Sequence, residues 1–316
     1  MTQAKGPTAK IWRDGLLVDW ADATIHVMGH SVHYGSSLFE GVRCYSTPEG
    51  GAVFRLRDHM RRLHDSAKIY RVPLRHSIDE LVQATVDTVA ANELTQCYIR
   101  PLVVRTGEQM GIWAENVPVE TFIICYEWGS YLGHAALEDG ADACVSSWRR
   151  AAPDTFPMMA KAGGNYINSQ LSKMEAKLNG YSEGIMLDAN GHVAEGSGEN
   201  LFAVRDNVLY TAPIGAGILN GITRDTIIRL AADMGLKVRE ELMPREFLYV
   251  VDELFFSGTA AEITPIKSVD RIPVGTGRPG EVTLAMQREY MGITHGTIAD
   301  RHGWLTMVPE PAAALR

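Results

Sequence analysis

The sequence has few cysteines and no long apolar run. Its four cysteines are far apart and form no CxxC pair, which argues against a disulfide framework or a zinc knuckle. No stretch reaches about 18 consecutive apolar residues, and residues 1–10 lack the apolar core of a signal peptide. We therefore expect no membrane span and no secretory signal, and a cytoplasmic protein with reduced thiols is the simplest interpretation.

An excess of positive charge is also absent. The 316 residues carry 30 Lys+Arg against 38 Asp+Glu, a formal net charge of −8. The protein as a whole therefore has no electrostatic reason to bind nucleic acid or anionic membranes. Any anionic ligand must be held by a few placed cations. Hydrophobic residues at 46% and charged residues at 22% exclude intrinsic disorder, and the length predicts two domains.

Residues 1–128 predict a small α+β domain. Asp14-Gly15 is a hairpin turn signal, and helical spacing of apolar residues covers 55–71. A capping box, Ser77 to Glu80, opens a second helix that runs to about Leu94. Strands are predicted at 98–104 and 119–126. Pro101 has no backbone N–H, so it predicts that the first of these is an edge strand or is bulged.

Residues 129–137 predict an interdomain linker, and residues 138–316 a larger, β-rich domain with packed helices. Predicted helices cover 165–179, which Gly180 ends, 223–234 and 281–291. Hairpins turn at 189–191 and 206–207, and further strands lie near 237–241, 253–257 and 263–269. Lys173 and Lys177, four residues apart, indicate a solvated helix face.

The sequence has only eight lysines, and Lys161 is the unusual one. It lies in the segment AKAGGNY, where small residues leave room for a bulky ligand at its amine. A lysine that forms a Schiff base must be partly neutral, which burial or a nearby cation achieves. Taken alone, Lys161 is more simply an exposed loop lysine.

Three other clusters carry polar groups at Gly-rich turns. Residues 195–202 (EGSGENLF) follow a strand pair, and their first carboxylate suits a cationic heteroaromatic nitrogen such as that of pyridoxal phosphate. Residues 220–225 (NGITRD) run into a helix start that could receive a phosphate. Residues 257–261 (SGTAA) could form an anion-binding nest of backbone N–H groups. Each cluster alone is also compatible with a plain polar turn.

Two further patterns resemble motifs of other functions, metal binding and dinucleotide binding. His26, His30 and His33 lie close together, but without HExxH or a carboxylate at ligand spacing they predict no metal site. Residues 275–280 match GxGxxG, but no βαβ unit accompanies them, so dinucleotide binding is not expected.

In their order and spacing, these clusters resemble the fold-type IV pyridoxal-phosphate enzymes, and especially branched-chain amino acid aminotransferases. The resemblance extends over roughly residues 10–306. It includes HYG at 33–35, FEGVR at 39–43, HMRRLH at 59–64 and YIRP at 98–101. Asn220 departs from the pattern, because related sequences often have proline there. The implied fold is α+β, with a small N-terminal domain and a larger cofactor-binding domain.

The resemblance implies pyridoxal 5'-phosphate as cofactor and a role for each matching residue. Lys161 would be the catalytic lysine to which the cofactor attaches, Glu195 the partner of its ring nitrogen, and Tyr166 that of its ring hydroxyl. The remaining cofactor contacts would come from Arg62, Leu219, Ile222, Thr223 and Thr259. Substrate contacts would come from Tyr34, which a partner subunit could supply, and from Phe39, Arg43, Tyr98, Arg100, Trp128, Tyr131, Thr259 and Ala260.

The implied reaction is a reversible ping-pong transamination between L-leucine, L-isoleucine or L-valine and 2-oxoglutarate, in branched-chain amino acid biosynthesis. Lys161 would move the Cα proton, and Arg100 would meet the distal carboxylate of glutamate. Small-molecule partners, no nucleic acid, no metal and a homodimer or higher homo-oligomer, up to a hexamer, are implied as well. D-amino acid or amine transaminases and aminodeoxychorismate lyases share this frame and remain alternatives. A metal-binding protein without lysine chemistry is the alternative of another class.

Overall fold

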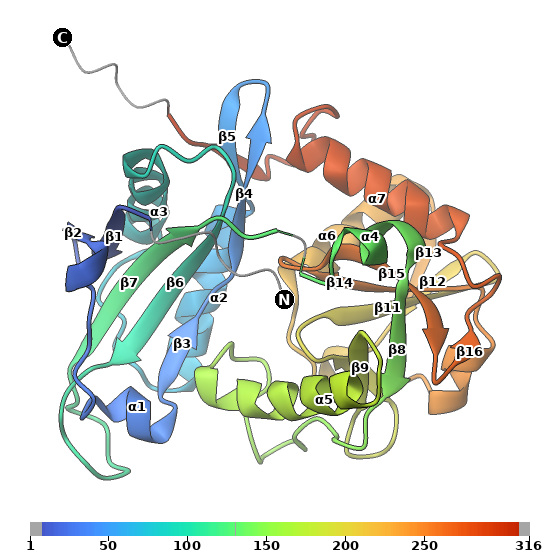
Figure 1. Cartoon of the computed structure of the whole chain (residues 1–316), viewed down its shortest axis with the longest axis horizontal. Helices are drawn as coiled ribbons and strands as arrows, with labels where there is room; N and C mark the ends of the chain where they lie inside the picture. The colour runs from blue at the N-terminus through green and yellow to red at the C-terminus, as the bar shows by residue number, and fades with distance from the viewer. Residues whose placement is uncertain (1–7, 130, 310–316) are drawn as a thin grey trace. The chain divides into compact units, whose positions relative to one another are not determined.

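The structure, a computed structural model, describes residues 8–129 and 131–309 (Figure 1). These residues divide into two compact units. The N-terminal unit consists of residues 8–129, 160–164 and 292–309, and the C-terminal unit consists of residues 131–159 and 165–291. The domain boundaries predicted at residues 128 and 138 stay a prediction. The short segment 160–164 belongs to the N-terminal unit although the chain on both sides of it belongs to the other unit.

Within the described part of the N-terminal unit, eight strands form one sheet. Its order is β17-β5-β4-β6-β7-β1-β2, and β3 also pairs with β6. The strands are β1 (Lys10–Arg13), β2 (Leu16–Asp19), β3 (Ser37–Phe39), β4 (Val42–Thr47), β5 (Gly50–Phe54), β6 (Cys97–Arg105), β7 (Val119–Tyr126) and β17 (Leu305–Met307). The hairpin predicted at Asp14-Gly15 is confirmed as the β1–β2 turn, with φ of 44° and 101° at the two residues.

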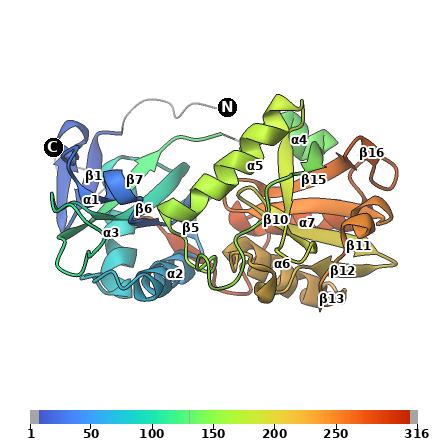
Figure 2. The same ribbon diagram turned by 90° about the horizontal axis from the view of Figure 1, so that it is seen from below.

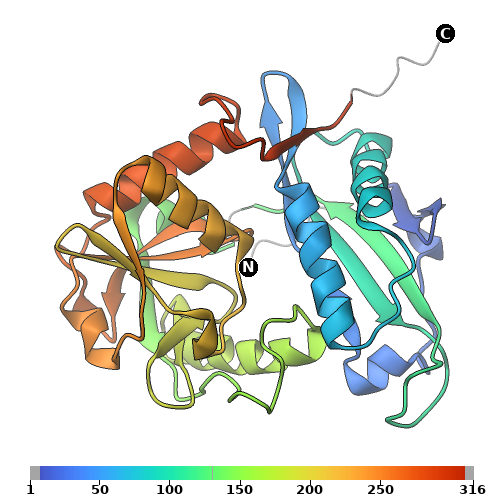
Figure 3. The same cartoon turned by 180° about the vertical axis from the view of Figure 1, so that it is seen from behind.

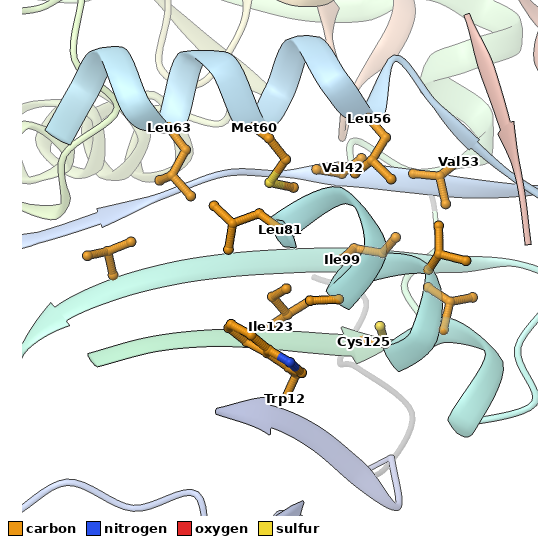
Figure 4. Close-up of a cluster of buried hydrophobic side chains, with 14 of the residues drawn as sticks. Trp12, Val42, Val53, Leu56, Met60, Leu63, Leu81, Ile99, Ile123 and Cys125 are labelled. Atoms are coloured by element: carbon orange, nitrogen blue, oxygen red, sulfur yellow. The ribbon is translucent and has the colours of Figure 1, made fainter. Parts of the chain in front are cut away.

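Two amphipathic helices, α2 (Leu56–Ile69) and α3 (Ile78–Ala91), cover one face of this sheet (Figure 3). Leu56, Met60 and Leu63 of α2 and Leu81 of α3 are fully buried against the sheet (Figure 4). Both predicted helices are confirmed, and so is the capping box, in which the Ser77 hydroxyl accepts from Glu80 N. A shorter helix, α1 (His30–Tyr34), precedes β3.

The prediction for Pro101 is wrong. It lies inside β6, which pairs along its whole length with β7 and on its other side with β3 and β4. The missing N–H is tolerated because β3 pairs with residues 102–104 and β4 with residues 97–99. Pro101 therefore faces the break between the two partner strands, where its carbonyl accepts from Glu40 N at 2.8 Å.

The described part of the C-terminal unit contains a nine-stranded sheet, in the order β10-β9-β8-β15-β14-β11-β12-β13, with β16 on β15. β10 also pairs with β11, so part of the sheet closes on itself. The strands are β8 (Ala141–Val145), β9 (Glu183–Leu187), β10 (Val193–Gly196), β11 (Asn200–Arg205), β12 (Val208–Thr211), β13 (Lys237–Glu240), β14 (Glu253–Gly258), β15 (Glu262–Val269) and β16 (Ile272–Pro273). The predicted hairpins at 189–191 and 206–207 are confirmed as the β9–β10 and β11–β12 connections.

The helices of this unit are α4 (His134–Asp139), α5 (Tyr166–Leu178), α6 (Ile222–Asp233) and α7 (Glu281–Thr294), the last of which continues into the N-terminal unit at residue 292. α5, which Figure 2 shows along its length, packs on β9. The predicted helices at 165–179, 223–234 and 281–291 are confirmed. Most of α4 falls in residues 129–137, for which a linker is predicted. Short 3₁₀ turns occupy Trp20–Asp22, Gly163–Asn165, Ile214–Ala216 and Arg245–Tyr249. The described chain has no helix long and apolar enough to span a bilayer.

Candidate active site

Lys161 is held by backbone contacts on β3 and α2 of the N-terminal unit. Its N–H donates to Ser66 Oγ at 3.0 Å, and its carbonyl accepts from Phe39 N at 3.0 Å. A bridge between Leu38 and Ala162 extends this pairing. A Cβ at Gly163 would lie 2.3 Å from Ser37 Oγ, so the small residue is needed for the close approach of the two segments. The lysine is therefore fixed on the sheet and does not hang in an open loop.

The Lys161 amine lies over an aromatic ring. Its Nζ is 5.0 Å from the centroid of the Phe39 ring, within the range of a cation–π contact. Its side chain is half-buried. His59 is close enough that the Lys161 charge contributes to lowering the pKa of that imidazole, after burial and the charge of Arg62. Lys161 is thus partly enclosed among groups that respond to its charge.

A buried carboxylate, Glu40, lies in the β3–β4 connection and contacts α2. It is 0% exposed and accepts from Arg62 Nε at 2.7 Å, Arg62 Nη2 at 2.8 Å and Gly41 N at 3.2 Å. Its Oε2 is 2.7 Å from His59 Nδ1. Burial alone would raise the pKa of Glu40, but the Arg62 charge and the hydrogen bonds from Arg62 and His59 hold that pKa well below its usual range. The group is therefore an ionised carboxylate clamped by an arginine.

An aromatic wall with cations lies on the face of the N-terminal sheet opposite the core of Figure 4. Strand alternation explains it, because Cys97 and Ile99 of β6 face the core while Tyr98 and Arg100 face the other way. Arg100 Cζ is 4.6 Å from the Phe39 ring centroid and 5.5 Å from that of Tyr98. The contacts bring together Phe39, Tyr98, Arg100, Tyr126 and Trp128.

One arginine contact and one close approach at a glycine shape this wall. Arg43 pairs in register with Tyr98 on the neighbouring strand, and its Nη2 donates to Gly129 O at 3.2 Å. A Cβ at Gly41 would lie 2.0 Å from Tyr98 Oη, so only glycine leaves room for that hydroxyl. Tyr34 is not part of this group. Its hydroxyl accepts from Gly111 N at 3.0 Å, its ring contacts His30 and His33, and its side chain is exposed.

The C-terminal unit also has a buried carboxylate with an arginine partner. Glu195, at the end of β10 and 3% exposed, forms a short ion pair with Arg150. Its Oε2 accepts from Asn200 Nδ2 at 2.9 Å, and Leu219 N lies 3.1 Å and 3.2 Å from its two oxygens. Arg150 is held in turn by Asn168 Oδ1 and Ser169 Oγ, both at 3.3 Å. The carboxylate is therefore fixed from several elements.

The helix start predicted as a phosphate site lies next to Asn200. Gly221 is the N-cap of α6 and makes no side-chain cap, and Thr223 in the first turn is buried. A Cβ at Gly221 would lie 2.0 Å from Asn200 Oδ1, which explains the glycine. Ser257 pairs in register with Asn200, so both side chains share one face of the sheet. Ser257 Oγ is buried and finds no hydrogen-bond partner in the described chain. Thr259 and Ala260 follow in the β14–β15 turn.

Tyr131 and Lys173 belong to a buried cluster of titratable groups. Lys173 forms a short ion pair with Glu183, and its Nζ lies 4.8 Å from the Tyr131 ring centroid. The prediction of a solvated face is therefore wrong for Lys173, because a buried acid on β9 attracts the amine inward. Burial and then the Glu183 charge raise the pKa of Glu199 to about 8. Burial and the charges of Glu199 and Glu183 also raise the pKa of Tyr131.

The histidines near the N-terminus make ordinary polar contacts. His30 binds Ser36 Oγ and Gly111 O at 2.7 Å and 3.0 Å, and His33 Nε2 is 3.1 Å from Val27 O. Among residues 8–129 and 131–309 there is no group of three or more His, Cys, Asp or Glu that could hold a metal ion.

The predicted site residues form two groups, one in each unit. The N-terminal unit carries Tyr34, Phe39, Arg43, Arg62, Tyr98, Arg100, Trp128 and Lys161, and the C-terminal unit carries Tyr131, Tyr166, Glu195, Leu219, Ile222, Thr223, Thr259 and Ala260. No role was predicted from the sequence for Glu40, Arg150 or Asn200, which contact predicted site residues directly, or for His59, which contacts Glu40. In the sequence, the available signal for Glu40 was a charged residue among apolar neighbours in a strand-like segment.

The chain is similar to known proteins over most of its length. Residues 37–269 match the family model "Amino-transferase class IV". A branched-chain-amino-acid aminotransferase of Escherichia coli K12 is 54% identical over 304 residues, 95% of this chain and 97% of the relative. The crystal structure of an E. coli branched-chain amino acid aminotransferase has 52% identity and a TM-score of 0.91, and covers 96% of this chain and 100% of its own. The branched-chain amino acid aminotransferase of Thermobaculum terrenum, solved in its PLP-bound holo-form, has 36% identity and a TM-score of 0.90, covering 96% and 100%.

Proposed function

The chain belongs to the class IV aminotransferase family and has its fold-type IV, α+β architecture, and we propose that it exchanges amino groups between branched-chain L-amino acids and 2-oxoglutarate. Activity as a pyridoxal-phosphate-dependent transaminase of branched-chain amino acids follows from the near full-length likeness. The acceptor and the role of each residue are the proposal. The contact of Arg100 with the Phe39 and Tyr98 rings carries it, because one wall then offers both an apolar surface and a cation.

The residues present fit the cofactor. The phosphate would be held by the Arg62 guanidinium and the first turn of α6, with the backbone of Ile222, the Thr223 hydroxyl and Thr259 as further donors. Glu195, which accepts from Asn200, Arg150 and Leu219 N, has the acceptor chemistry that a protonated ring nitrogen needs. Tyr166 would bind the ring hydroxyl, and Leu219 would pack on the ring. The buried Ser257 Oγ indicates that this face is built for a further polar group.

The bound cofactor supplies an electron sink that acidifies the substrate Cα–H. The protein supplies the rest. Lys161 Nζ takes the Cα proton as general base and returns one as general acid. Glu195 keeps negative charge next to the position of the ring nitrogen. The backbone amides of Thr259 and Ala260 and the Tyr98 hydroxyl would bind the substrate α-carboxylate.

The substrate side chain would lie against Phe39, Trp128, Tyr131 and Tyr34, with Arg43 at the polar edge. A leucine or valine side chain gains from the apolar rings, whereas an unpaired glutamate carboxylate would be costly to bury there. Arg100 supplies the missing cation for glutamate and 2-oxoglutarate. Both substrates can therefore use one pocket.

We further propose that the chain works as a homo-oligomer in the cytoplasm. Ile112 and Trp113 are 91% and 79% exposed, in the loop whose Gly111 N–H binds the Tyr34 hydroxyl. Two large apolar side chains together on a surface favour coverage by another copy, which would bring Tyr34 close to a partner subunit. The reduced, buried cysteines suit the cytoplasm.

A donor panel tests the proposed specificity. We expect turnover with 2-oxoglutarate for L-leucine, L-isoleucine and L-valine, and none for D-alanine or an aryl amine. Borohydride should fix the cofactor to Lys161, which peptide mass spectrometry locates. Turnover of D-alanine or the aryl amine in place of the L-amino acids would replace the proposal by the D-amino acid or amine transaminase alternative. 4-Aminobenzoate and pyruvate formed from aminodeoxychorismate would indicate the lyase.

A further inference from the structure

The Glu40 carboxylate binds Arg62 in a two-point fork. Arg62 Nε and Nη2 donate to Oε1 and Oε2 at 2.7 Å and 2.8 Å, the side-on geometry in which a carboxylate fixes both the position and the plane of a guanidinium. A guanidinium has five N–H donors, and the fork to Glu40 uses two of them along one edge. Arg62 is thereby held in one orientation on α2.

Glu40 is itself held from two further directions. His59, one turn before Arg62 on α2, places Nδ1 2.7 Å from Glu40 Oε2, and Gly41 N donates to the same oxygen at 3.2 Å. An ionised carboxylate only accepts hydrogen bonds, so Nδ1 of His59 carries the proton. Burial and, to a smaller extent, the Arg62 charge lower the pKa of His59, which keeps the ring neutral. The two charged groups are therefore Glu40 and Arg62, and His59 is a neutral hydrogen-bond donor to Glu40.

We propose that Glu40, held by His59, is a positioning residue that orients the Arg62 guanidinium for the cofactor phosphate. The inference rests on the proposed phosphate role of Arg62. A flexible arginine loses side-chain entropy when it binds an anion. An arginine already fixed by a fully buried carboxylate loses less, so Glu40 strengthens phosphate binding although its own charge is negative. The simple charge argument predicts the opposite sign, namely that removal of Glu40 tightens phosphate binding.

The test compares pyridoxal phosphate with pyridoxal, which has the same aldehyde and ring but no phosphate. Dissociation constants come from absorbance titrations of the full-length apoprotein. In E40Q the amide NH₂ must face a donor of Arg62 or His59, so the fork is lost with little change in volume. We expect E40Q to weaken pyridoxal phosphate about tenfold and to change pyridoxal by less than about twofold. The ratio that matters is the dissociation constant of pyridoxal divided by that of pyridoxal phosphate, which falls when phosphate binding weakens. In an R62M background, E40Q should have no further effect on this ratio.

A matched control lies on the same helix. Asp58 accepts from Arg55 Nε at 2.6 Å, another carboxylate paired with a buried arginine. D58N should leave the ratio unchanged. His59 provides a second route if E40Q does not fold. Asn at position 59 can keep a donor near Glu40, so H59N should bind the phosphate nearly as well as the unaltered chain, whereas H59L should lower the ratio.

Unchanged or tightened pyridoxal phosphate binding in E40Q, or equal weakening of both ligands, would overturn the positioning role. Equal behaviour of H59N and H59L would do the same. An R62M variant with the normal ratio would instead refute the phosphate role of Arg62, which separates failure of the premise from failure of the inference.

Discussion

Each unit buries one carboxylate against one arginine, and the proposed roles within the two pairs are reversed. In the N-terminal unit Arg62 would meet the ligand and Glu40 supports it. In the C-terminal unit Glu195 would meet the ligand and Arg150 supports it. The ligand explains the reversal, because a phosphate is anionic and a protonated pyridine nitrogen is cationic. A buried pair lets a site present one sign of charge without burying that charge alone.

The two buried carboxylate–arginine pairs also explain how an acidic protein can bind an anionic cofactor. The net charge of −8 describes the whole chain. Both arginines are largely buried and fixed by local partners, so the solvated exterior screens them little. The sequence predicts that a few placed cations hold the anionic ligands. Arg62 was among them, whereas Arg150 was overlooked.

The largest expected effect is on the chemical step, in which the two carboxylate–arginine pairs should differ. E195Q removes the charge from the C-terminal pair while keeping its shape, and an amide cannot hold a proton on the ring nitrogen. We expect kcat to fall about 10³-fold with little change in cofactor affinity. R62M should do the reverse, weakening the cofactor strongly and kcat at saturating cofactor weakly. Equal kcat losses in the two variants would show that the pairs do not differ in role.

The next effect concerns the supporting member of the C-terminal pair. R150M leaves Glu195 buried without its arginine, which typically costs about 3–5 kcal/mol of stability. R150K keeps the charge but not the fork, so it should lose less. Urea unfolding of the apoprotein, followed by far-UV circular dichroism, measures both. R149M is the control, since Arg149 donates to Ala189 O at the surface. A stable R150M would mean that the pair is not needed for folding.

A smaller effect separates the two substrates. R100M removes the cation of the aromatic wall and keeps its apolar contact with Phe39 and Tyr98. We expect kcat/KM for glutamate to fall by about 10- to 100-fold and kcat/KM for leucine to change by less than about threefold. Steady-state kinetics with each donor measure the ratio. Equal losses for glutamate and leucine would remove Arg100 from the distal-carboxylate role.

The sequence predicted the elements with strong local signals. The α2 and α3 helices follow apolar spacing and a capping box, and the hairpins follow Asp-Gly, Asn-Gly and Asp-Asn turns, so short-range chemistry was enough. Pro101 could not be placed this way. Its tolerance in a central strand depends on a gap between two partner strands from elsewhere in the chain.

The same limit applies to the site. The roles proposed for Lys161 and Glu195 come from the motifs in which they lie. Lys173 was assigned to the surface because its partner, Glu183, comes from another element. Glu40 lies within a quoted motif, but its role depends on Arg62 and His59, 22 and 19 residues further along the chain. Motifs therefore suggest groups that would meet a ligand, whereas the partners that hold those groups come from elsewhere in the chain and are seen only in the structure.

The smallest expected effect is a pH dependence that only the C-terminal unit should show. The pKa of Glu199 is raised to about 8, from an ordinary value of 4.5. Between these values the folded chain keeps a proton that the unfolded chain releases, so stability should decrease as pH rises through that window. E199Q cannot ionise, so its melting temperature should exceed that of the unaltered chain by more at pH 8 than at pH 5, by a few degrees. E40Q offers the contrast, because the lowered pKa of Glu40 keeps it ionised across this range. A melting difference between E199Q and the unaltered chain that does not change with pH would show that Glu199 is ionised throughout.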